Sequence, residues 1–302
     1  MILIWGVPGD KPVAAVCEAL DRMGARVFFL NQHEVLRSEI ELSVNGAVEG
    51  VLRSPQGEVR LEQITAAYLR PYESARLPEL AGATPAIAAR VEAFDDAVLT
   101  WTEVTAARVV NRPSAMASNQ SKPYQLALIH EHGFLVPETL VTTDAAALEA
   151  FREKHGDVIY KSISGVRSVV TRFRPEHCGR MAALAHSPVQ FQQRIEGTDV
   201  RVHVAGDEVL ACAVRSGAVD YRYPRGDEES PDIVPCELSA EVTERCQRLA
   251  ASLGLFVAGI DLRRTPEDDW YCFEVNPSPA FTFYAEATGL DIGHAVARVL
   301  TS

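Results

Sequence analysis

The sequence lacks the segments that would place the chain in a membrane or a secretory pathway. No apolar run reaches the roughly 20 residues that a membrane-spanning helix needs. No basic segment precedes the apolar start, which runs from Met1 to Gly6 and predicts a first β-strand, not a signal peptide. We therefore expect a cytoplasmic protein that binds no membrane.

Paired cysteines and clustered histidines are also missing. The 302 residues include six cysteines, and none stands in a Cys-x-x-Cys pair. The two histidines of His130-Glu131-His132 fall on different faces of the helix that we predict there. This pattern argues against a disulfide framework and a zinc site, and predicts reduced, mostly buried thiols.

Basic residues are few relative to acidic ones. The chain has 29 Lys and Arg against 41 Asp and Glu, which gives a formal net charge of −12. Sequence-independent binding to nucleic acid relies on a basic surface, so we expect no nucleic-acid partner. An anionic substrate would need local clusters of Arg and Lys.

Hydrophobic periodicity predicts a small α/β unit over residues 1–110. Its expected elements are a strand at 2–5, a helix at 11–23, a strand at 26–30, hairpins around Asn45-Gly46 and Pro55-Gln56-Gly57, a strand at 66–69 and one long helix at 84–108. The turn from Gly6 to Gly9 lacks the full G-x-G-x-x-G spacing. We interpret it as a strand-to-helix turn, with a phosphate cradle as the alternative.

A different pattern follows from Lys122 onward. We predict helices at 123–132, 145–155 (N-capped by Asp144) and 239–253. Strands are expected at 158–161, 169–173, 189–195, 200–205, 208–215, 256–263 and 270–275, with a polar loop at 217–235. No internal repeat is visible. The predicted domains are an N-terminal unit at 1–110, a central unit at 111–195 and a C-terminal unit at 196–302.

Two predicted antiparallel strands near the C-terminus carry the clearest chemistry. Asp261 lies in Gly-Ile-Asp-Leu, and Glu274 and Asn276 lie in Glu-Val-Asn-Pro. Residues two apart on a strand share a face, so Glu274 and Asn276 project together, with Asp261 opposite them. Three oxygen donors suit Mg²⁺ that bridges nucleotide phosphates. The alternative is three solvated polar side chains, but the flanking apolar runs favour buried carboxylates that need a cation.

These motifs resemble the metal-binding end of the ATP-grasp superfamily, and most closely its RimK-type branch and the microviridin-type (graspetide) macrocyclising ligases. The resemblance covers residues from about 110 to 300. The segments that carry it are Asn111-Arg112-Pro113, Ser121-Lys122-Pro123, Val136-Pro137-Glu138-Thr139, Tyr160-Lys161, Phe191-Gln192-Gln193-Arg194-Ile195, Asp199-Val200-Arg201-Val202 and Ala287-Thr288-Gly289-Leu290. A softer N-terminal likeness includes Tyr68-Leu69-Arg70-Pro71. The implied fold is an ATP-grasp fold of mixed α/β and α+β type, with an N-terminal pre-ATP-grasp domain, a central lid and a C-terminal antiparallel sheet.

The same resemblance implies a set of ATP-binding residues. Lys122 and Lys161 match the lysines that contact phosphates or adenine, and Asp199 matches the acidic residue near the ribose. The segment with Gln192, Gln193 and Ile195 matches the hinge that reads the adenine edge. Ser164 and Gly165 lie in the loop that closes over the triphosphate, which contains fewer glycines here than in many members. Each of these residues has a structural alternative: a surface lysine for Lys122 and Lys161, a turn residue for Asp199 and a hairpin turn for the loop.

Arginines form two further groups. Arg201, Arg215 and Arg222 are the implied catalytic set, in which guanidinium groups would stabilise the transferred phosphoryl group; Asp220-Tyr221-Arg222 is similar to an Asp-Trp-Arg segment of graspetide ligases. Solvated strand arginines are the alternative. Arg70 and Arg112 could contact substrate or simply lie on the surface.

The implied activity is ATP-dependent ligation of a carboxylate to an amine or hydroxyl through an acyl phosphate, releasing ADP and phosphate. The cofactors are ATP and Mg²⁺, with two ions expected and Mn²⁺ as a substitute. We expect a ribosomal precursor peptide, with or without a bound leader, as substrate, and a homodimer as the assembly. The alternatives are ligation of free amino acids or small peptides, and a nucleotide-binding regulatory module without turnover.

Overall fold

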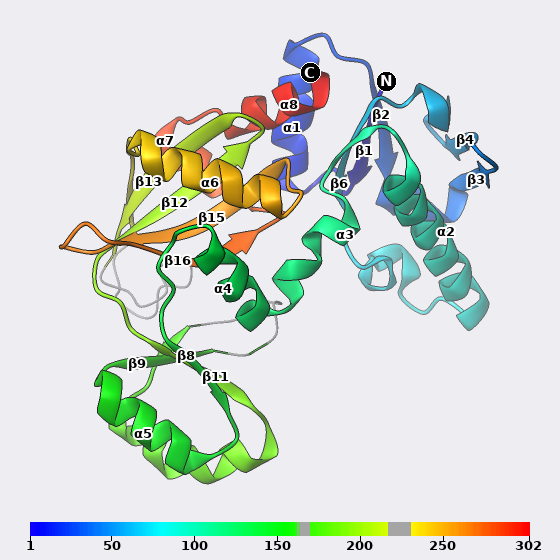
Figure 1. Ribbon diagram of the computed structural model, residues 1–302. Coiled ribbons are helices and arrows are strands. Elements are labelled where there is room, and N and C mark those ends of the chain that lie inside the picture. The colour runs from blue at the N-terminus through cyan, green and yellow to red at the C-terminus, as the bar shows by residue number, and fades with distance from the viewer. Residues whose placement is uncertain (162, 164–169, 217–230) are drawn as a thin grey trace.

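The computed structural model describes every residue except 162, 164–169 and 217–230, and it contains three α/β units arranged along the chain (Figure 1). The predicted residues Ser164, Gly165 and Arg222 lie outside the described part. Across that part, no helix is long and apolar enough to cross a membrane. All six cysteines are free; three are buried and Cys178 is exposed.

The N-terminal unit is built on a parallel sheet of order β2-β1-β6-β7. Its elements are β1 (Ile2–Gly6), α1 (Lys11–Arg22), β2 (Val27–Asn31), β3 (Glu39–Val44), β4 (Val48–Ser54), β5 (Gly57–Arg60), β6 (Ala66–Arg70), α2 (Pro85–Val104) and β7 (Arg108–Val110), with short 3₁₀ turns at Gln32–Arg37, Leu61–Gln63, Ser74–Arg76 and Pro78–Leu80. The predicted hairpins form the small antiparallel sheet β3-β4-β5. Apolar runs fill β1 and β6 because both faces of a parallel sheet are covered.

The lid unit is a four-stranded sheet of order β10-β9-β11-β8. It contains β8 (Thr139–Thr142), α5 (Ala145–His155), β9 (Val158–Lys161), β10 (Thr171–Arg172), the 3₁₀ segment η6 (Pro175–His186) and β11 (Val189–Gln193). Its small core includes Leu148, Val158, Leu184 and Phe191, so α5 and η6 cover one face. Figure 1 shows α5 on the outer side of this sheet, away from the C-terminal unit.

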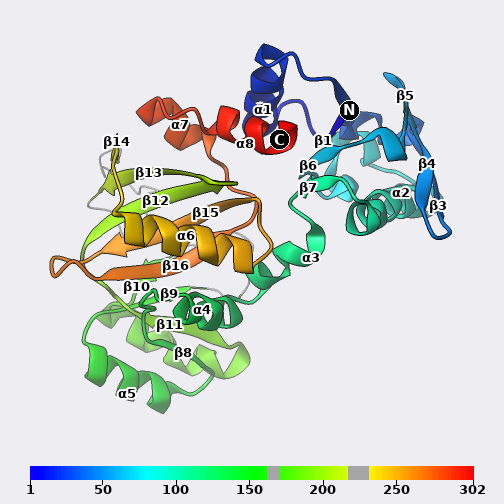
Figure 2. The same ribbon diagram turned by 45° about the horizontal axis from the view of Figure 1, so that its top comes forward.

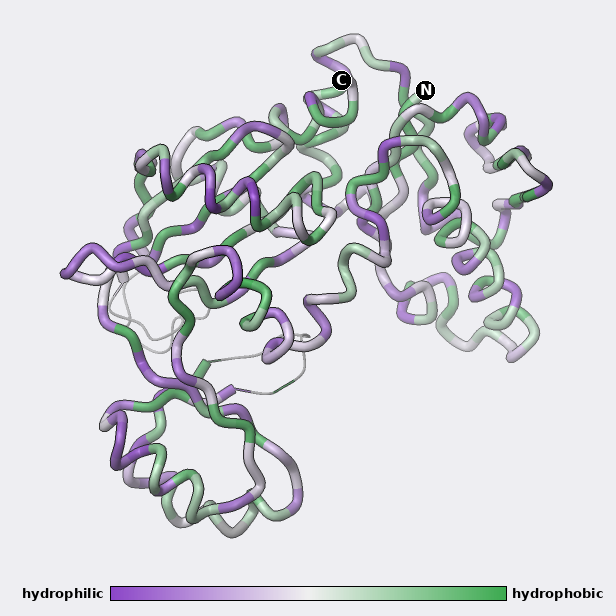
Figure 3. Tube along the Cα trace, in the orientation of Figure 1, coloured by the Kyte–Doolittle hydropathy of each residue, from purple (hydrophilic) through white to green (hydrophobic). Residues whose placement is uncertain are grey.

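The C-terminal unit is a five-stranded antiparallel sheet of order β14-β13-β12-β15-β16. Its elements are β12 (Thr198–Ala205), β13 (Glu208–Arg215), β14 (Asp232–Pro235), α6 (Ala240–Ser252), β15 (Val257–Arg264), β16 (Trp270–Asn276), α7 (Thr282–Thr288) and α8 (Ile292–Thr301). Helix α6 packs on one face of this sheet and α8 lies beside α1, as Figure 2 shows from a second direction. In Figure 3 the central strands are mainly hydrophobic, whereas α6 alternates as an amphipathic helix does.

A linker of short helices joins the units. It contains α3 (Pro113–Met116), a 3₁₀ turn (Ala117–Gln120) and α4 (Lys122–Glu131). Helix α4 packs against β16 and contributes Leu126 and Ile129 to the core of the C-terminal unit. The domain boundaries at 110 and 195 stay a prediction; the packing shows that α4 contacts the C-terminal sheet.

Three expectations about individual elements are corrected by the structure, and some elements were not predicted. Helix α2 ends at Val104, not at 108, and residues 108–110 form β7. The C-terminal part of the expected loop 217–235 is the strand β14. The strand expected at 189–195 ends at Gln193. Helices α7 and α8 and the segment η6 were not predicted, although Ile292, Val296 and Val299 show helical spacing.

Candidate active site

The three predicted oxygen donors lie together on one face of the C-terminal sheet. Asp261 on β15 is paired directly with Glu274 on β16, and Gly259 is paired with Asn276. The register shifts by one residue between Asp261 and Leu262, which is a bulge directly beside the carboxylates. Two carboxylates and one amide therefore point to the same side, as expected from the spacing.

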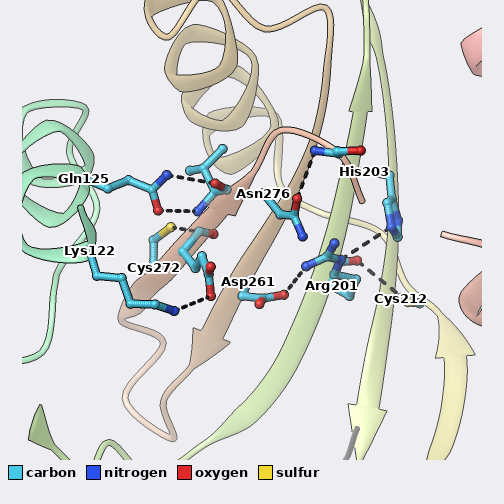
Figure 4. A network of polar contacts seen from close by, with 11 residues as sticks. Lys122, Gln125, Arg201, His203, Cys212, Asp261, Cys272 and Asn276 are labelled. Atoms are coloured by element: carbon cyan, nitrogen blue, oxygen red, sulfur yellow. Dashed lines mark hydrogen bonds and ion pairs between the residues drawn. The ribbon is translucent and has the colours of Figure 1, made fainter. Parts of the chain in front are cut away.

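Two buried cations neutralise these carboxylates, and Figure 4 shows them within one polar network. Arg201 on β12 forms an ion pair with Asp261, and the Lys122 Nζ atom lies 3.3 Å from Glu274 Oε2. The side chains of Lys122 and Arg201 are 8% and 7% exposed, so both charges depend on these partners. The sequence did not predict either pairing.

Asn276 and the two carboxylates form a donor set that fits Mg²⁺. The Asn276 Oδ1 atom accepts a hydrogen bond from the Ser278 backbone N–H at 2.9 Å, which fixes the amide and leaves a second lone pair on that oxygen. Among the described residues, no group of three or more His, Cys, Asp and Glu side chains could hold a metal. A set with an amide as third ligand is the composition that a phosphate-bridging Mg²⁺ accepts.

Helix α4 holds the edge strand β16 in place. The amide of Gln125 donates to the Val275 carbonyl at 2.8 Å and accepts from the Val275 N–H at 2.9 Å. β16 is at the edge of its sheet, so these two backbone groups would otherwise lack partners. Gln125 and Lys122 are three residues apart on α4, which aligns both side chains with the strand. The sequence analysis did not single out Gln125.

Lys161 and two glutamines face away from the hydrophobic core of the lid. Gln190 is paired with Lys161, and Gln192 with Ile159, so these side chains share the face opposite to Phe191. Lys161 is 7% exposed, and the Gln192 Nε2 atom donates to Thr139 Oγ1 at 2.9 Å. The Gln190 side chain is fully buried, and neither of its amide atoms has a hydrogen-bond partner among the residues that the structure describes. A buried unpaired amide is unusual, so Gln190 joins the candidates that the sequence analysis missed.

Arg263 holds the segment between the lid and the C-terminal unit, the predicted hinge, in place. Its guanidinium forms an ion pair with Asp199 at 2.6 Å and donates to the Ile195 carbonyl at 2.7 Å. The Gln193 backbone N–H donates to the Glu138 carbonyl at 2.9 Å. A pocket of about 230 Å³ opens beside this hinge, lined by residues 193–196, 265–267, Asp269 and Tyr271. Asp199 therefore has a structural partner, and its predicted contact with a ribose stays a prediction.

The remaining predicted arginines lie apart from the carboxylates. Arg215 lies at the end of β13 and pairs with Asp232, and both side chains are largely exposed. Arg201 is paired with Cys212, which is three residues from Arg215 along β13. Because side chains alternate along a strand, Arg215 and Arg201 lie on opposite faces of the sheet. Arg112 donates to the carbonyls of Thr102, Thr105 and Ala107, and thereby caps the end of α2. The catalytic role of Arg215 and the substrate-binding role of Arg112 stay predictions.

Arg70 does reach the loop that follows the donor set. Its guanidinium pairs with Asp10 at 3.0 Å and donates to Ser278 Oγ at 2.8 Å and to the Pro279 carbonyl at 3.2 Å. Asp10 also caps α1. Arg70 thus connects the N-terminal unit to the segment that follows Asn276.

Comparison with known proteins shows which family the chain belongs to. A family model described as a RimK-like ATP-grasp domain matches residues 117–300. The chain is 25% identical over 243 residues to a probable alpha-L-glutamate ligase of Picosynechococcus, covering 76% of this chain and 79% of the relative.

Solved structures agree over almost the full length. The ATP-grasp ligase PsnB, complexed with a phosphomimetic variant of a minimal precursor, Mg and ADP, aligns with a TM-score of 0.79 and 26% identity, covering 99% of this chain and 97% of PsnB. The macrocyclase MdnC of Microcystis aeruginosa, bound with the precursor peptide MdnA, shares the fold with a TM-score of 0.82 at 18% identity, covering 99% of both chains. The chain therefore belongs to the RimK-like ATP-grasp family of ligases and has the ATP-grasp fold.

Proposed function

We propose that the protein is an ADP-forming ligase that activates a peptide carboxylate with ATP and joins it to an amine or hydroxyl. The observation that carries this proposal is the donor set of Asp261, Glu274 and Asn276, surrounded by the buried cations Lys122 and Arg201. Oxygen ligands and flanking cations on one face are what a polyphosphate substrate requires.

The residues serve two chemical steps. In the first, a carboxylate oxygen of the substrate forms a bond to the γ-phosphorus while the bond to the β,γ-bridging oxygen breaks, and ADP leaves. Arg201 stabilises the negative charge on the transferred group, and Lys122 and Lys161 hold the phosphates. In the second step an amine or hydroxyl attacks the acyl carbon and loses its proton, and phosphate leaves. Asp261, Glu274 and Asn276 would hold Mg²⁺, which supplies positive charge at the β- and γ-phosphates.

The substrate proposal is supported by the relatives. PsnB binds a precursor peptide, and its likeness extends over nearly the whole chain, including the N-terminal unit that the family model does not match. The relatives named probable alpha-L-glutamate ligases favour a second candidate, the addition of free L-glutamate. We also propose, from the family resemblance alone, that the protein is a homodimer, which light scattering in solution would test.

One experiment separates the candidates. The purified protein is incubated with Mg·ATP and either L-glutamate or an acidic precursor peptide that also contains Lys, Ser and Thr, and ADP and the product masses are recorded. The peptide proposal predicts ADP release with loss of one water from the peptide for each bond formed. ADP release with glutamate alone would support the second candidate. No ADP release in either case would contradict the proposed activity.

A further inference from the structure

Position 259 requires a glycine because a side chain there would have no room, and not because of the backbone conformation. It lies in the regular strand β15 and its φ is not in the left-handed region, so any L-residue could adopt its backbone angles. A Cβ atom there would lie 2.0 Å from Arg201 Nη2, 2.7 Å from Arg201 Cζ and 2.8 Å from Pro279 Cβ. The Arg201 guanidinium thus lies directly over the backbone of β15, in the volume that a side chain would fill.

His203 contacts the same guanidinium from its own strand. It is two residues from Arg201 on β12, and the Arg201 Nε–H donates to His203 Nε2 at 3.4 Å. His203 is 1% exposed, and burial together with the charge of Arg201 lowers its pKa well below the ordinary value. The ring is therefore neutral at physiological pH, and Nε2 accepts while Nδ1 carries the proton. A neutral acceptor at this place orients Arg201 without adding charge.

Tyr284 of α7 is a third neighbour of the guanidinium. The Arg201 Cζ atom lies 5.4 Å from the centroid of the Tyr284 ring, which is the distance of a cation–π contact, and the rings of Tyr284 and His203 are 5.3 Å apart. Tyr284 is 5% exposed, and His203 and Gly259 are also buried, so all three neighbours of the guanidinium are held by the packing around them. Figure 4 shows Arg201 between His203 and Asp261.

We propose that Gly259, His203 and Tyr284 are positioning residues that fix the Arg201 guanidinium beside Asp261 for phosphoryl transfer. Guanidinium groups stabilise transition-state charge only when they are held in place beforehand, because reorganisation during the reaction removes the benefit. The backbone of β15 fixes the depth of the group, His203 fixes its direction and Tyr284 prevents it from turning away. This inference rests on the proposed function, since Arg201 acts there on the transferred group.

The test compares His203→Leu with His203→Gln, using the substrate that the wild-type protein turns over with Mg·ATP, either L-glutamate or the precursor peptide. Leu removes the acceptor and Gln keeps one. We expect His203→Leu to lower kcat for ADP release by at least about tenfold with little change in KM for ATP, since a small misplacement of a catalytic group costs this much. His203→Gln should recover most of the rate.

Gly259→Ala and its control Gly179→Ala keep the test decisive if His203→Leu does not fold. Gly259→Ala should lower kcat similarly, whereas Gly179→Ala, whose Cβ would meet no atom of the described residues within 4 Å, should not. In an Arg201→Lys background, His203→Leu should cause little additional loss, because its effect passes through the guanidinium.

Three outcomes would overturn the inference. One is equal kcat values for the Leu and Gln variants, and another is a full additional loss in the Arg201→Lys background. The third is a Gly259→Ala enzyme with wild-type kcat. A wild-type protein that releases no ADP would instead refute the proposed function, and the inference with it.

Discussion

Replacement of Lys161 by Met should weaken nucleotide binding while leaving the fold intact. Lys161 is 7% exposed at the end of β9, on the lid face that turns away from the core of Phe191 and Leu148. A charge-assisted hydrogen bond to a phosphate contributes about 1.5–3 kcal/mol, which corresponds to a factor of roughly 10 to 150 in Kd. Met has a similar length and keeps the apolar packing of the lysine stem.

The assay is calorimetric titration with Mg·AMPPNP, which binds without turnover. Lys154→Met is the matched control, because Lys154 belongs to the same unit but is 61% exposed and pairs with the exposed Glu138. We expect a Kd raised more than tenfold for Lys161→Met and unchanged for Lys154→Met. Equal affinities of the two variants would show that Lys161 does not contact the nucleotide, and the role assigned to the lid face would be refuted.

Further predictions concern the metal set, the hinge, the edge strand and the thiols. Glu274→Gln and Asn276→Ala should abolish ADP release with little loss of folding, whereas Glu267→Gln in the exposed β15–β16 turn should leave ADP release unchanged. Near wild-type turnover of the Glu274 or Asn276 variant in Mg²⁺ would exclude the donor set as the metal site. Asp199→Asn should lower the free energy of unfolding in urea by about 1 kcal/mol, more than Asp268→Asn, because the pair with Arg263 is about one-fifth exposed and the pair of Arg264 with Asp268 is mostly exposed. Gln125→Ala should cost about 1–3 kcal/mol, because it leaves both backbone groups of Val275 unpaired at the sheet edge; a change below a few tenths would contradict that clamp. Burial raises the pKa of the Cys212 and Cys246 thiols from 9.0 to about 12, so these thiols stay protonated in the fold at a pH where they ionise in the unfolded chain. The free energy of unfolding should therefore fall as the pH rises from 9.0 to about 12. Of the six cysteines, the exposed Cys178 alone should react quickly with a thiol reagent at neutral pH.

Local patterns predicted the part of the site that lies on two neighbouring strands. Asp261, Glu274 and Asn276 are close in sequence, and strand periodicity is enough to place them on one face. The hairpins of the N-terminal unit and the cap at Asp144 also follow from local residue types.

Long-range contacts could not be predicted from the sequence. The pairs of Lys122 with Glu274 and of Arg70 with Asp10 span 152 and 60 positions, and nothing local specifies them. The requirement for glycine at position 259 was not predicted, because it depends on the path of a side chain from another strand. Arg112 was predicted to be either a substrate contact or a surface residue; its contacts with the end of α2 were not predicted, and that end was itself predicted four residues too late.

The short strands β7 and β14 were not predicted, for a related reason. β7 has three residues and β14 four, so neither shows a periodicity that can be separated from its surroundings. β7 exists because it completes a parallel sheet beside β6, and β14 because it pairs with β13. Their strand character comes from tertiary pairing, which sequence patterns do not contain.

The most direct test of the proposed chemistry follows one oxygen atom. The substrate, L-glutamate or the precursor peptide, is prepared with oxygen-18 in all of its carboxylates and incubated with the protein, Mg·ATP and hydroxylamine as the nucleophile. An acyl phosphate predicts ADP, a hydroxamate and inorganic phosphate that carries one oxygen-18 from the carboxylate. Stoichiometric AMP that carries the label, with unlabelled pyrophosphate, would show attack at the α-phosphorus and would contradict the account.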